Sequence, residues 1–545
     1  MGWARRGSEG LLVGHHLHQQ FPQATAMRSF LAAHAPSVRS VLSGFDRLVF
    51  RGRLIALYRP RAMHSLLARA GVRLLDFKRY VKKTSERVRD ASLAEASELE
   101  RPVRYLKSSR TSKEELARQL FREYPADSGL IAALTTVEPC TSFEYHRSKN
   151  ESERGLRPRT RKCLHIYKYY MHPVFGFMNV RIQTWFPFSI QICLNGREWL
   201  GRQLDAVGAS DYRRADNCFT YLGDPELAQR LMDKQLATDW KSALDEIAHW
   251  INPIHDEIFE PWPQSYYWCT YQSEWATDIA FSSPAELERL YPRLVRRATL
   301  DFHSPDVMRF LGRKCHGRYE GELTTSFKDR AEGVRVKHWA DGNSIKMYDK
   351  MGSVLRVETT LAKPTPYKVY RARSNDPEGA KSWRPMRKGV ADLHRWTEVS
   401  RNANQIYLDG LASTEISTPV AEVFDAVSKR RTVEGRAVRA LKLNDPEDLA
   451  MLDTIARGEF ALAGFRNKDL RKWIFRTSAS ARTTVEARRQ SALISRRLRL
   501  LRDHGLIKKV PKSYRYRLTD KGHRLVATLQ LVRRATLDGL EAVAA

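Results

Sequence analysis

Alternation of apolar and polar residues is clearest in three short segments that follow one another near the middle of the chain. Successive side chains of a β-strand point to opposite faces, so a period of two residues predicts strands. Short turns separate the segments, and Asn195-Gly196 after the last one is a strong turn signal. The pattern therefore predicts three antiparallel strands in a meander. They are Cys163–Pro173, Phe177–Phe186 and Phe188–Leu194.

A second block of alternating residues follows about 140 residues later. The turn Asp349–Ser353 joins its last two segments into a hairpin. On the first strand of that hairpin Lys346, Tyr348 and Lys350 share a face, and Arg356, Glu358 and Thr360 share a face on the second. The predicted strands are Gly333–Trp339, Asn343–Asp349 and Val354–Leu361.

Apolar residues recur at helical spacing in much of the remaining chain. Residues 61–125 read as helices, and Ser112 with Glu115 fits a capping box at the start of the last one. Residues 225–256 and 284–311 also show this spacing, as do 389–440. The sequence thus predicts an α+β fold with a largely antiparallel sheet core and many helices.

The C-terminal part repeats helix signals with a basic character. Asp445 fits an N-cap with Pro446 at the first helical position, and Gly505 fits the C-cap of a helix over 486–504. Two short strands follow, at 506–510 and 514–518. The predicted divisions are 1–26, a disordered leader; 27–160, a helical region with an early strand; 161–363, a strand-rich core with inserted helices; 364–444, a connector with helices; 445–525, a C-terminal domain; and 526–545, a closing helix.

The composition indicates a folded protein with a polyanionic partner. Hydrophobic residues make up 42% of the 545 residues, and the net charge is +31. Self-repulsion of that size favours nucleic acid as the partner. No apolar run approaches the length of a membrane span, so no membrane partner is expected. None of the six cysteines forms a Cys-x-x-Cys pair, which favours reduced thiols and a cytoplasmic location.

Several carboxylates stand where propensity disfavours them or where they repel each other. Asp46 interrupts the predicted strand 41–50, and Glu358 lies on the second hairpin strand. Glu274 and Asp278 would share one face of a helix over 266–281, which makes them candidate catalytic residues, as paired metal ligands or as an acid and a base. Metal-dependent phosphoryl transfer needs such ligands, so Asp46 and Glu358 are candidates to bind Mg²⁺ or Mn²⁺, and Tyr348 is a candidate nucleophile. Ion pairs with neighbouring Arg and Lys side chains remain the alternative at each position.

Two segments resemble known families. The order helix, helix, basic helix and basic hairpin is similar to a winged helix-turn-helix, and it rests on residues 495–507 and 516–522 within 445–525. This resemblance implies a DNA-binding domain at the C-terminus. A Lys-x-Tyr-Asp-Lys strand followed by an Arg-x-Glu strand, within 343–361, resembles replication initiators of filamentous phages and small plasmids more weakly. The histidine pair that binds metal in those enzymes is missing, since His165 and His172 fall on opposite faces of a regular strand.

The expected function is nucleic-acid binding, with DNA processing for a mobile genetic element such as replication initiation, transposition or recombination. A non-enzymatic winged-helix regulator and an RNA-binding protein remain alternatives. The closing helix is expected to pack on the C-terminal domain or to pair with a second copy of the chain. The expected nucleic-acid contacts are Arg488, Arg489, Ser495, Arg496, Arg497 and Arg499 on the third helix, Lys508, Lys509, Lys512 and Arg515 on the hairpin, Tyr167, Tyr169 and Arg181 on the meander, and Lys346 and Lys350.

Overall fold

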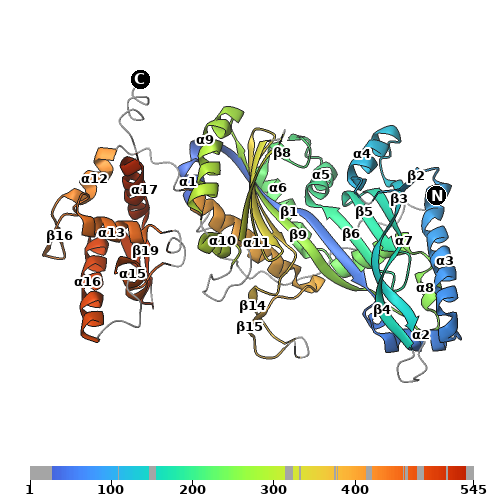
Figure 1. Cartoon of the computed structure of the whole chain (residues 1–545). Coiled ribbons are helices and arrows are strands. Elements are labelled where there is room, and N and C mark those ends of the chain that lie inside the picture. Colours follow the sequence, from blue (N-terminus) through green and yellow to red (C-terminus); the bar gives the residue numbers. More distant parts are fainter. Residues whose placement is uncertain are drawn as a thin grey trace.

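A computed structural model shows one large sheet and a separate helical body at the C-terminal end (Figure 1). The sheet has 11 strands in the order β10-β11-β12-β13-β9-β1-β6-β5-β4-β3-β2. Every neighbouring pair is antiparallel except β2 and β3. The predicted α+β class and largely antiparallel core are therefore confirmed. The structure describes residues 28–108, 110–146, 155–302, 304–312, 323–330, 333–373, 376, 378–412, 420–457, 460, 464–475, 484–510 and 513–534.

The strands of the large sheet are β1 (Val38–Arg53), β2 (Val103–Leu106), β3 (Gly129–His146), β4 (Gly155–His172), β5 (Gly176–Gln183), β6 (Ile190–Asn195), β9 (Tyr267–Phe281), β10 (Leu323–Arg330), β11 (Gly333–Ala340), β12 (Asn343–Lys350) and β13 (Val354–Leu361). Four two-stranded sheets are β7 (Tyr212–Arg214) with β8 (Phe219–Leu222), β14 (Lys368–Arg371) with β15 (Ser382–Pro385), β16 (Arg431–Val433) with β17 (Arg436–Val438), and β18 (Ile507–Lys509) with β19 (Tyr516–Leu518).

The helices before residue 413 are α1 (Arg28–Ala33), α2 (Pro60–Arg69), α3 (Phe77–Glu98), α4 (Lys113–Glu123), α5 (Gly196–Ala206), α6 (Pro225–Lys234), α7 (Trp240–Ile251), α8 (His255–Phe259), α9 (Pro284–Arg296), α10 (Ser304–Phe310) and α11 (Leu393–Leu411). The C-terminal body contains α12 (Val420–Ser428), α13 (Pro446–Ile455), α15 (Asn467–Ile474), α16 (Thr484–Asp503) and α17 (Asp520–Arg534). Ser112 and Asp445 cap α4 and α13 through their side chains, as predicted.

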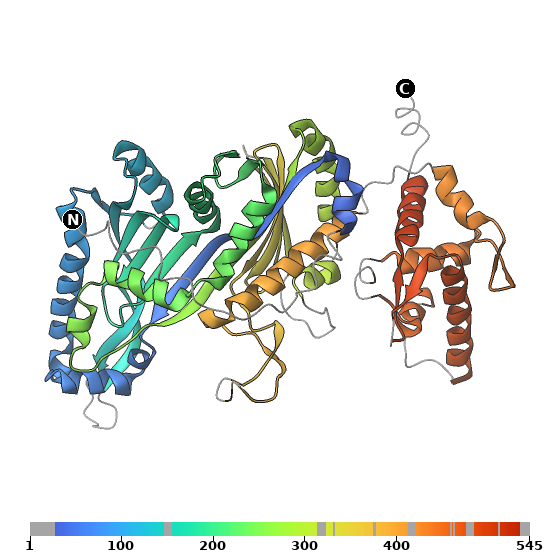
Figure 2. The ribbon, with the colours of Figure 1, turned by 180° about the vertical axis from the view of Figure 1, so that it is seen from behind.

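Helix α11 covers the face of the sheet that looks away from the viewer in Figure 1, and Figure 2 shows it crossing the strands from behind. Its Asn404 donates to the backbone oxygens of Trp275 and Val357, at 3.0 Å each, and so pins the helix to β9 and β13. The apolar side chains of alternate strand positions, such as Leu355 and Met347, point to this side and form a buried cluster with α9, α10 and α11. The other alternate positions of these strands carry the charged residues described below.

Strand β1 lies at the centre of the sheet order, and the two halves of this strand have different neighbours. β9 pairs with it along almost its whole length, whereas β6 reaches only from Arg47 to Gly52. Beyond that point α6 and α5 complete the backbone hydrogen bonds: Gln229 bonds both backbone groups of Ser43, and Arg197 donates to the Phe45 oxygen. On this edge of β1, the hydrogen-bonding partner therefore changes from a strand to helices at the position of Asp46.

One predicted element is wrong. Residues 267–281 form the central strand β9 and not a helix. The segment is rich in aromatic and β-branched residues, and it is buried on both faces, so its apolar positions show no clear period. Since positions i and i+4 share a face in a strand as well, Glu274 and Asp278 still lie on one side.

The predicted division at residue 160 falls inside the sheet, because β3 and β4 pair across it over 17 residue pairs. β1 and β2 belong to the same sheet, so 27–160 and 161–363 share one structure. The C-terminal body has its own core, which extends from Val423 to Leu529 and therefore includes α12 of the predicted connector. The predicted leader and the last residues of the closing helix lie outside the described residues.

No helix in the described parts of the chain is both long enough and apolar enough to cross a membrane.

Candidate functional site

Three strands bring carboxylates to one point on the polar face of the sheet. Phe45 pairs with Trp275 and Arg47 with Glu274, so Asp46 is the extra residue of a β-bulge in β1. Bulges re-aim side chains and are common beside active sites. On β13, Glu358 lies opposite Ala276, between Glu274 and Asp278 of β9. The register of three neighbouring strands thus directs these acids to one place.

The predicted ligands Asp46 and Glu358 do come together, and Glu274 joins them. Each offers one carboxylate oxygen, and these oxygens all lie within 4.8 Å of one another. Mg²⁺ holds its ligands at about 2.1 Å, so opposite ligand oxygens stand about 4.2 Å apart. The upper limit of 4.8 Å is close to this spacing, so small side-chain shifts would bring the three carboxylates around one ion. We call Asp46, Glu274 and Glu358 the carboxylate cluster.

Buried cations hold this cluster in place. The Arg356 guanidinium donates to Asp46 Oδ1 at 2.8 Å and to Asp278 at 2.5 and 2.8 Å. Arg197 of α5 also donates to Asp278, at 2.9 Å to Oδ2. Asp278 is therefore saturated by two arginines. It positions Arg356, and it is not part of the carboxylate cluster.

The charge balance differs between the two aspartates. Burial raises the pKa of Asp46, and Arg356 offsets this only in part because Glu358 works in the same direction as burial. For Asp278 burial also acts to raise the pKa, but Arg356 and Arg197 outweigh it and the pKa is lowered. An ionised Asp46 is thus under-compensated, and an added cation beside it would be stabilising.

Lys346 of β12 lies at the open side of the cluster. Its Nζ is 2.7 Å from Glu358 Oε1, across the direct strand pair Lys346–Glu358. Burial acts to lower the pKa of Lys346, but Glu358 and Glu274 outweigh it and the pKa is raised, so the ammonium stays charged. This lysine could release Glu358 to a metal ion and turn to a phosphate.

Tyr348 is close to the cluster but is poorly suited to attack. Its hydroxyl donates to Glu358 Oε2 at 3.0 Å. Burial and the Glu358 charge raise its pKa well above 10.0, so the phenolate is scarce near neutral pH. A role for Tyr348 as hydrogen-bond donor to Glu358 fits these contacts better than the predicted role as nucleophile.

Asp46→Asn is expected to raise the unfolding midpoint in metal-free buffer near neutral pH. Because the folded pKa of Asp46 is above its ordinary value of 3.8, its stabilising contribution is complete below pH 3.8 and is lost as the pH rises through the folded pKa. Asparagine keeps an acceptor for Arg356 and Asn217 without the charge. Thermal unfolding measured at about pH 4 and about pH 8 checks this: the gain must be larger at the higher pH, and a loss at the higher pH contradicts it.

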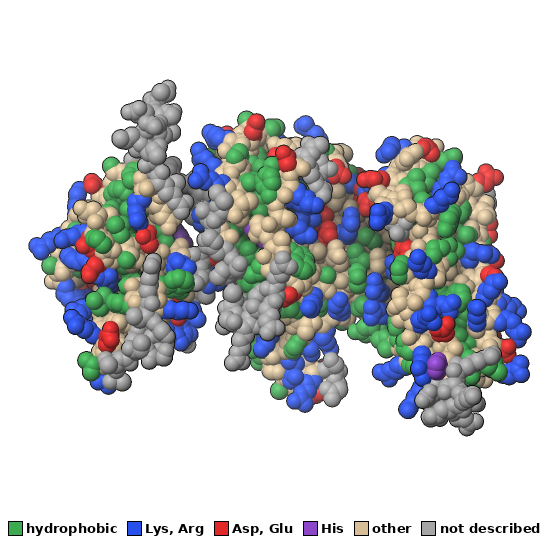
Figure 3. All heavy atoms as spheres, viewed as in Figure 1, with side chains coloured by type: hydrophobic (Ala, Val, Ile, Leu, Met, Phe, Trp, Pro, Cys, Tyr) green, Lys and Arg blue, Asp and Glu red, His purple; other side chains and the backbone are tan. Residues whose placement is uncertain are grey.

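Basic side chains continue from the cluster along the same face. The strand register places Lys337 opposite Lys346, Arg335 opposite Tyr348, and Arg47 opposite Glu274. Figure 3 shows acidic and basic side chains close together near the middle of this face. Lys350, a predicted phosphate contact, is instead buried and paired with Asp216 of the β7–β8 connection. It is not available to a ligand in this arrangement.

The predicted stacking face of the meander is also occupied by the protein itself. Tyr169 is buried against Phe177. The Tyr167 hydroxyl donates to both oxygens of Glu138 at 2.9 Å, and Arg181 lies 3.5 Å from the same carboxylate. The prediction that Tyr167, Tyr169 and Arg181 bind bases or phosphates gains no support from these contacts, because helix α4 packs on this end of the sheet. Sequence alternation cannot show which face of the sheet a helix from elsewhere in the chain covers.

In the C-terminal body, α16 exposes most of its predicted contacts. Ile494, Leu498 and Leu501 point to the core, whereas Arg488, Arg489, Arg496 and Arg499 are exposed on the other side. α15 flanks this surface on one side, where Asn467 donates to Ser495 at 2.9 Å. Arg497 is different, since it is held by Glu447. Lys508 and Lys509 are exposed on β18, Arg515 donates to the Gly464 oxygen, and Lys512 lies outside the described residues.

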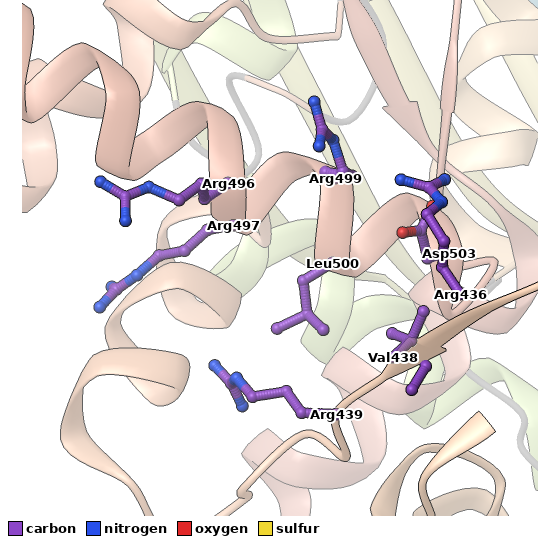
Figure 4. Close-up of a pocket in the computed structure, with 9 residues that line it drawn as sticks. Arg436, Val438, Arg439, Arg496, Arg497, Arg499, Leu500 and Asp503 are labelled. Atoms are coloured by element: carbon purple, nitrogen blue, oxygen red, sulfur yellow. The ribbon is translucent and has the colours of Figure 1, made fainter. Parts of the chain in front are cut away.

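A pocket of about 320 Å³ lies on the other flank of α16 (Figure 4). Arg496, Arg497 and Arg499 line it from the helix, and Arg436 and Arg439 line it from the β16–β17 hairpin and the residue after it. Arg439 is fixed by two hydrogen bonds of 2.7 Å to Asp448, and its backbone oxygen faces His504 Nε2 at 2.8 Å. The hairpin is therefore held firmly beside α16. Such a concentration of arginines fits phosphate oxygens.

Most apolar side chains of the closing helix are buried over its described length, although Val532 stays 43% exposed. Leu525, Val526 and Leu529 of α17 are buried in the core of the C-terminal body, and α17 packs on α12 and β19. The predicted packing of the closing helix on the C-terminal domain is therefore confirmed for these residues. Pairing with a second copy of the chain stays a prediction.

Residues from outside the strands complete the site and were missed by sequence reasoning. Arg197 begins α5, and Asn217, which donates to Asp46 at 2.7 Å, lies between β7 and β8. Neither stands in a motif, and only the folded sheet brings them to Asp46.

Comparisons of the chain with known protein families, with curated proteins and with solved structures found no match.

Proposed function

We propose that this protein processes nucleic acid by metal-dependent phosphoryl transfer at the carboxylate cluster. The observation that carries the proposal is the convergence of Asp46, Glu274 and Glu358 from three adjacent strands to within 4.8 Å, at a bulge and beside basic side chains. A phosphodiester needs a divalent cation to stabilise the developing charge and cations to hold the neighbouring phosphates. Both requirements meet on this face.

Each residue would have a defined part. Asp46, Glu274 and Glu358 would hold Mg²⁺ or Mn²⁺, which lowers the pKa of a bound water and polarises the phosphorus centre. Lys346 would leave Glu358 and bind an oxygen of the scissile phosphate. Arg356, fixed by Asp278, would keep Asp46 in its bulge orientation, and Lys337 and Arg47 would bind flanking phosphates.

The C-terminal body would bring this centre to its target as a winged helix-turn-helix. Three helices followed by the β18–β19 hairpin, with an arginine-rich exposed side on the third helix, support this. In such domains the third helix enters the major groove and the hairpin contacts the backbone. A mobile-element enzyme such as a replication initiator, transposase or recombinase combines these two activities, DNA recognition and strand processing.

The experiment that tests the function is incubation of end-labelled single- and double-stranded DNA and RNA with the full chain and Mg²⁺ or Mn²⁺. Metal-dependent cleavage or joining of at least one substrate is the expected result, with no product in EDTA. A lack of product on all four substrates would leave binding as the function.

A second candidate, a nucleic-acid-binding regulator or RNA-binding protein without catalysis, is favoured by one observation. Asp46, Glu358 and Glu274 each already have a partner, in Arg356, Lys346 and Gln272. In that case the carboxylate cluster would be a structural ion-pair network. Metal binding distinguishes the catalytic function from the non-catalytic one, because carboxylates that stay paired in a structural network would not bind a divalent ion.

Substituting Arg496 or Arg499 by alanine is expected to weaken duplex DNA binding and to lower its salt dependence. Each phosphate contact contributes about 0.9 to the slope of log K against log salt concentration on B-DNA. Anisotropy titrations of labelled duplex at several salt concentrations measure both values. Arg524→Ala, an exposed arginine of α17 outside the arginine pocket, is the matched control. Equal slopes for wild type and both variants would contradict the placement of α16 in the groove.

A further inference from the structure

The β14–β15 hairpin exposes two large aromatic side chains that the fold does not use. Tyr370 and Trp383 face each other across the hairpin, with ring centroids 5.8 Å apart. They remain 57% and 69% exposed, respectively, although both are residues that normally gain from burial. Figure 1 shows the hairpin projecting from the sheet on the side away from α5 and α6.

The base of the hairpin is rigid, so this exposure is not a sign of a loose segment. Tyr367, Val369 and Met386 are buried in the main core, and the Met386 amide donates to the Tyr367 oxygen at 2.8 Å. After β15 the chain returns to the sheet, where Thr270 of β9 donates to the Lys388 oxygen at 2.7 Å. The alternation inside the hairpin then places Tyr370 and Trp383 outward while Val369 points inward.

The surroundings of the pair are strongly basic. Residues 363–388 contain eight Lys or Arg and two Asp or Glu, a net charge of 8 − 2 = +6. Among these, Lys368, Arg373, Lys381 and Lys388 are exposed. Figure 3 shows Lys and Arg side chains on this projection. Exposed aromatic rings with cations beside them are the combination by which proteins hold unpaired nucleic acid, with bases stacked on the rings and phosphates on the cations.

The hairpin also leads to the carboxylate cluster. Lys388 lies 5.6 Å from the ring of Tyr271 on β9, and Arg51 of β1 lies 3.9 Å above the same ring. Glu274 follows three residues later on β9, about 10 Å along the strand. A chain of cations and one more half-exposed aromatic residue thus connects the hairpin to the proposed metal site.

We propose that the β14–β15 hairpin is a stacking arm that holds an unpaired strand of nucleic acid, with bases on Tyr370 and Trp383. The inference rests on the proposed function, since the strand so held would be the one that enters the carboxylate cluster. It assigns the single-strand contact to a segment that was predicted only as a basic connector. The fold thus places the exposed aromatic surface here and not on the buried tyrosines of the meander.

The test compares the full-length wild type with Trp383→Ala, Tyr370→Ala and Trp383→Phe in titrations with labelled oligo-dT and oligo-U. Loss of one stacking contact is expected to weaken single-strand binding about 5- to 150-fold. The slope of log K against log salt concentration should stay unchanged, because stacking releases no counterions. Lys368→Ala should instead lower that slope by about 0.7. The two oligonucleotides separate DNA from RNA as the preferred strand.

Trp383→Phe keeps a ring and is expected to retain most of the affinity, which excludes a general loss of folding as the cause. Tyr105→Ala, which removes an exposed tyrosine on the edge strand β2, is the control and should bind as the wild type does. Unchanged single-strand binding in Trp383→Ala and Tyr370→Ala overturns the inference, and so does an equal loss on duplex DNA. Duplex binding and metal-dependent turnover measured on the same variants show separately whether the proposed function holds.

Discussion

Replacing Arg356 by methionine is expected to lower the free energy of unfolding of the sheet part by about 3–5 kcal/mol. Arg356 is almost completely buried and is the shared partner of Asp46 and Asp278. Without it two buried carboxylates stay in the interior with only Arg197 to balance them. Methionine fills most of the volume, so the loss comes from charge rather than from a cavity.

Tryptophan fluorescence during urea unfolding can follow this change, because ten of the twelve tryptophans lie between residues 185 and 396. Arg87→Met is the matched control, since Arg87 pairs with Glu257 at the surface and its loss should cost less than about 1 kcal/mol. The effect of Arg356→Met should also shrink in acid, where the two aspartates become protonated. An effect no larger than that of Arg87→Met would show that the network around Asp278 does not hold the site together.

Replacing Glu358 by glutamine is expected to reduce metal-dependent turnover about 100-fold or more. Substituting even a residue behind a metal ligand commonly costs 10- to 100-fold in metal affinity or activity, and Glu358 is a proposed ligand itself. Glutamine keeps the shape and an acceptor for the Tyr348 hydroxyl, so the strand pairing with β12 should persist. Initial rates over a range of Mn²⁺ concentrations give both the turnover and the metal dependence.

Glu274→Gln should behave in the same way, because its carboxylate completes the cluster. Glu257→Gln changes an exposed glutamate of α8 and should leave turnover unchanged. Equal activity of Glu358→Gln and wild type, with nucleic-acid binding retained in both, would remove the carboxylate cluster from the mechanism.

The local sequence predicted the strand blocks well, and the register explains why. Lys346 and Glu358 alternate regularly on two strands joined by a short turn, so their direct pairing across the hairpin follows from the pattern alone. Asp46 stood out because an aspartate in a strand interior is disfavoured. The reason for it, a bulge in the pairing of β1 with β9, depends on a strand about 230 residues away and could not be seen in the sequence.

Segments buried on both faces were harder to predict. β9 is largely buried on both faces and rich in tryptophan and tyrosine, so its apolar positions gave no preference between helix and strand. The sequence also could not show whether polar side chains on a sheet face stay accessible to a ligand. Tyr167 and Lys350 fit nucleic-acid contacts by composition, but Glu138 and Asp216, brought in by other strands and loops, bind them. Exposed Tyr370 and Trp383 lie in a segment that composition alone marked as a linker.

The most direct test of the carboxylate cluster as a metal site is a Mn²⁺ titration of the full chain without nucleic acid, followed by electron paramagnetic resonance. A saturable site is expected in the wild type, with affinity that falls about 100-fold or more in Glu358→Gln. The site should also weaken as the pH falls, because protons compete for Asp46, whose pKa is raised by burial. Identical Mn²⁺ binding by the wild type and Glu358→Gln, or no saturable binding by the wild type, would contradict the assignment of the cluster as a metal site.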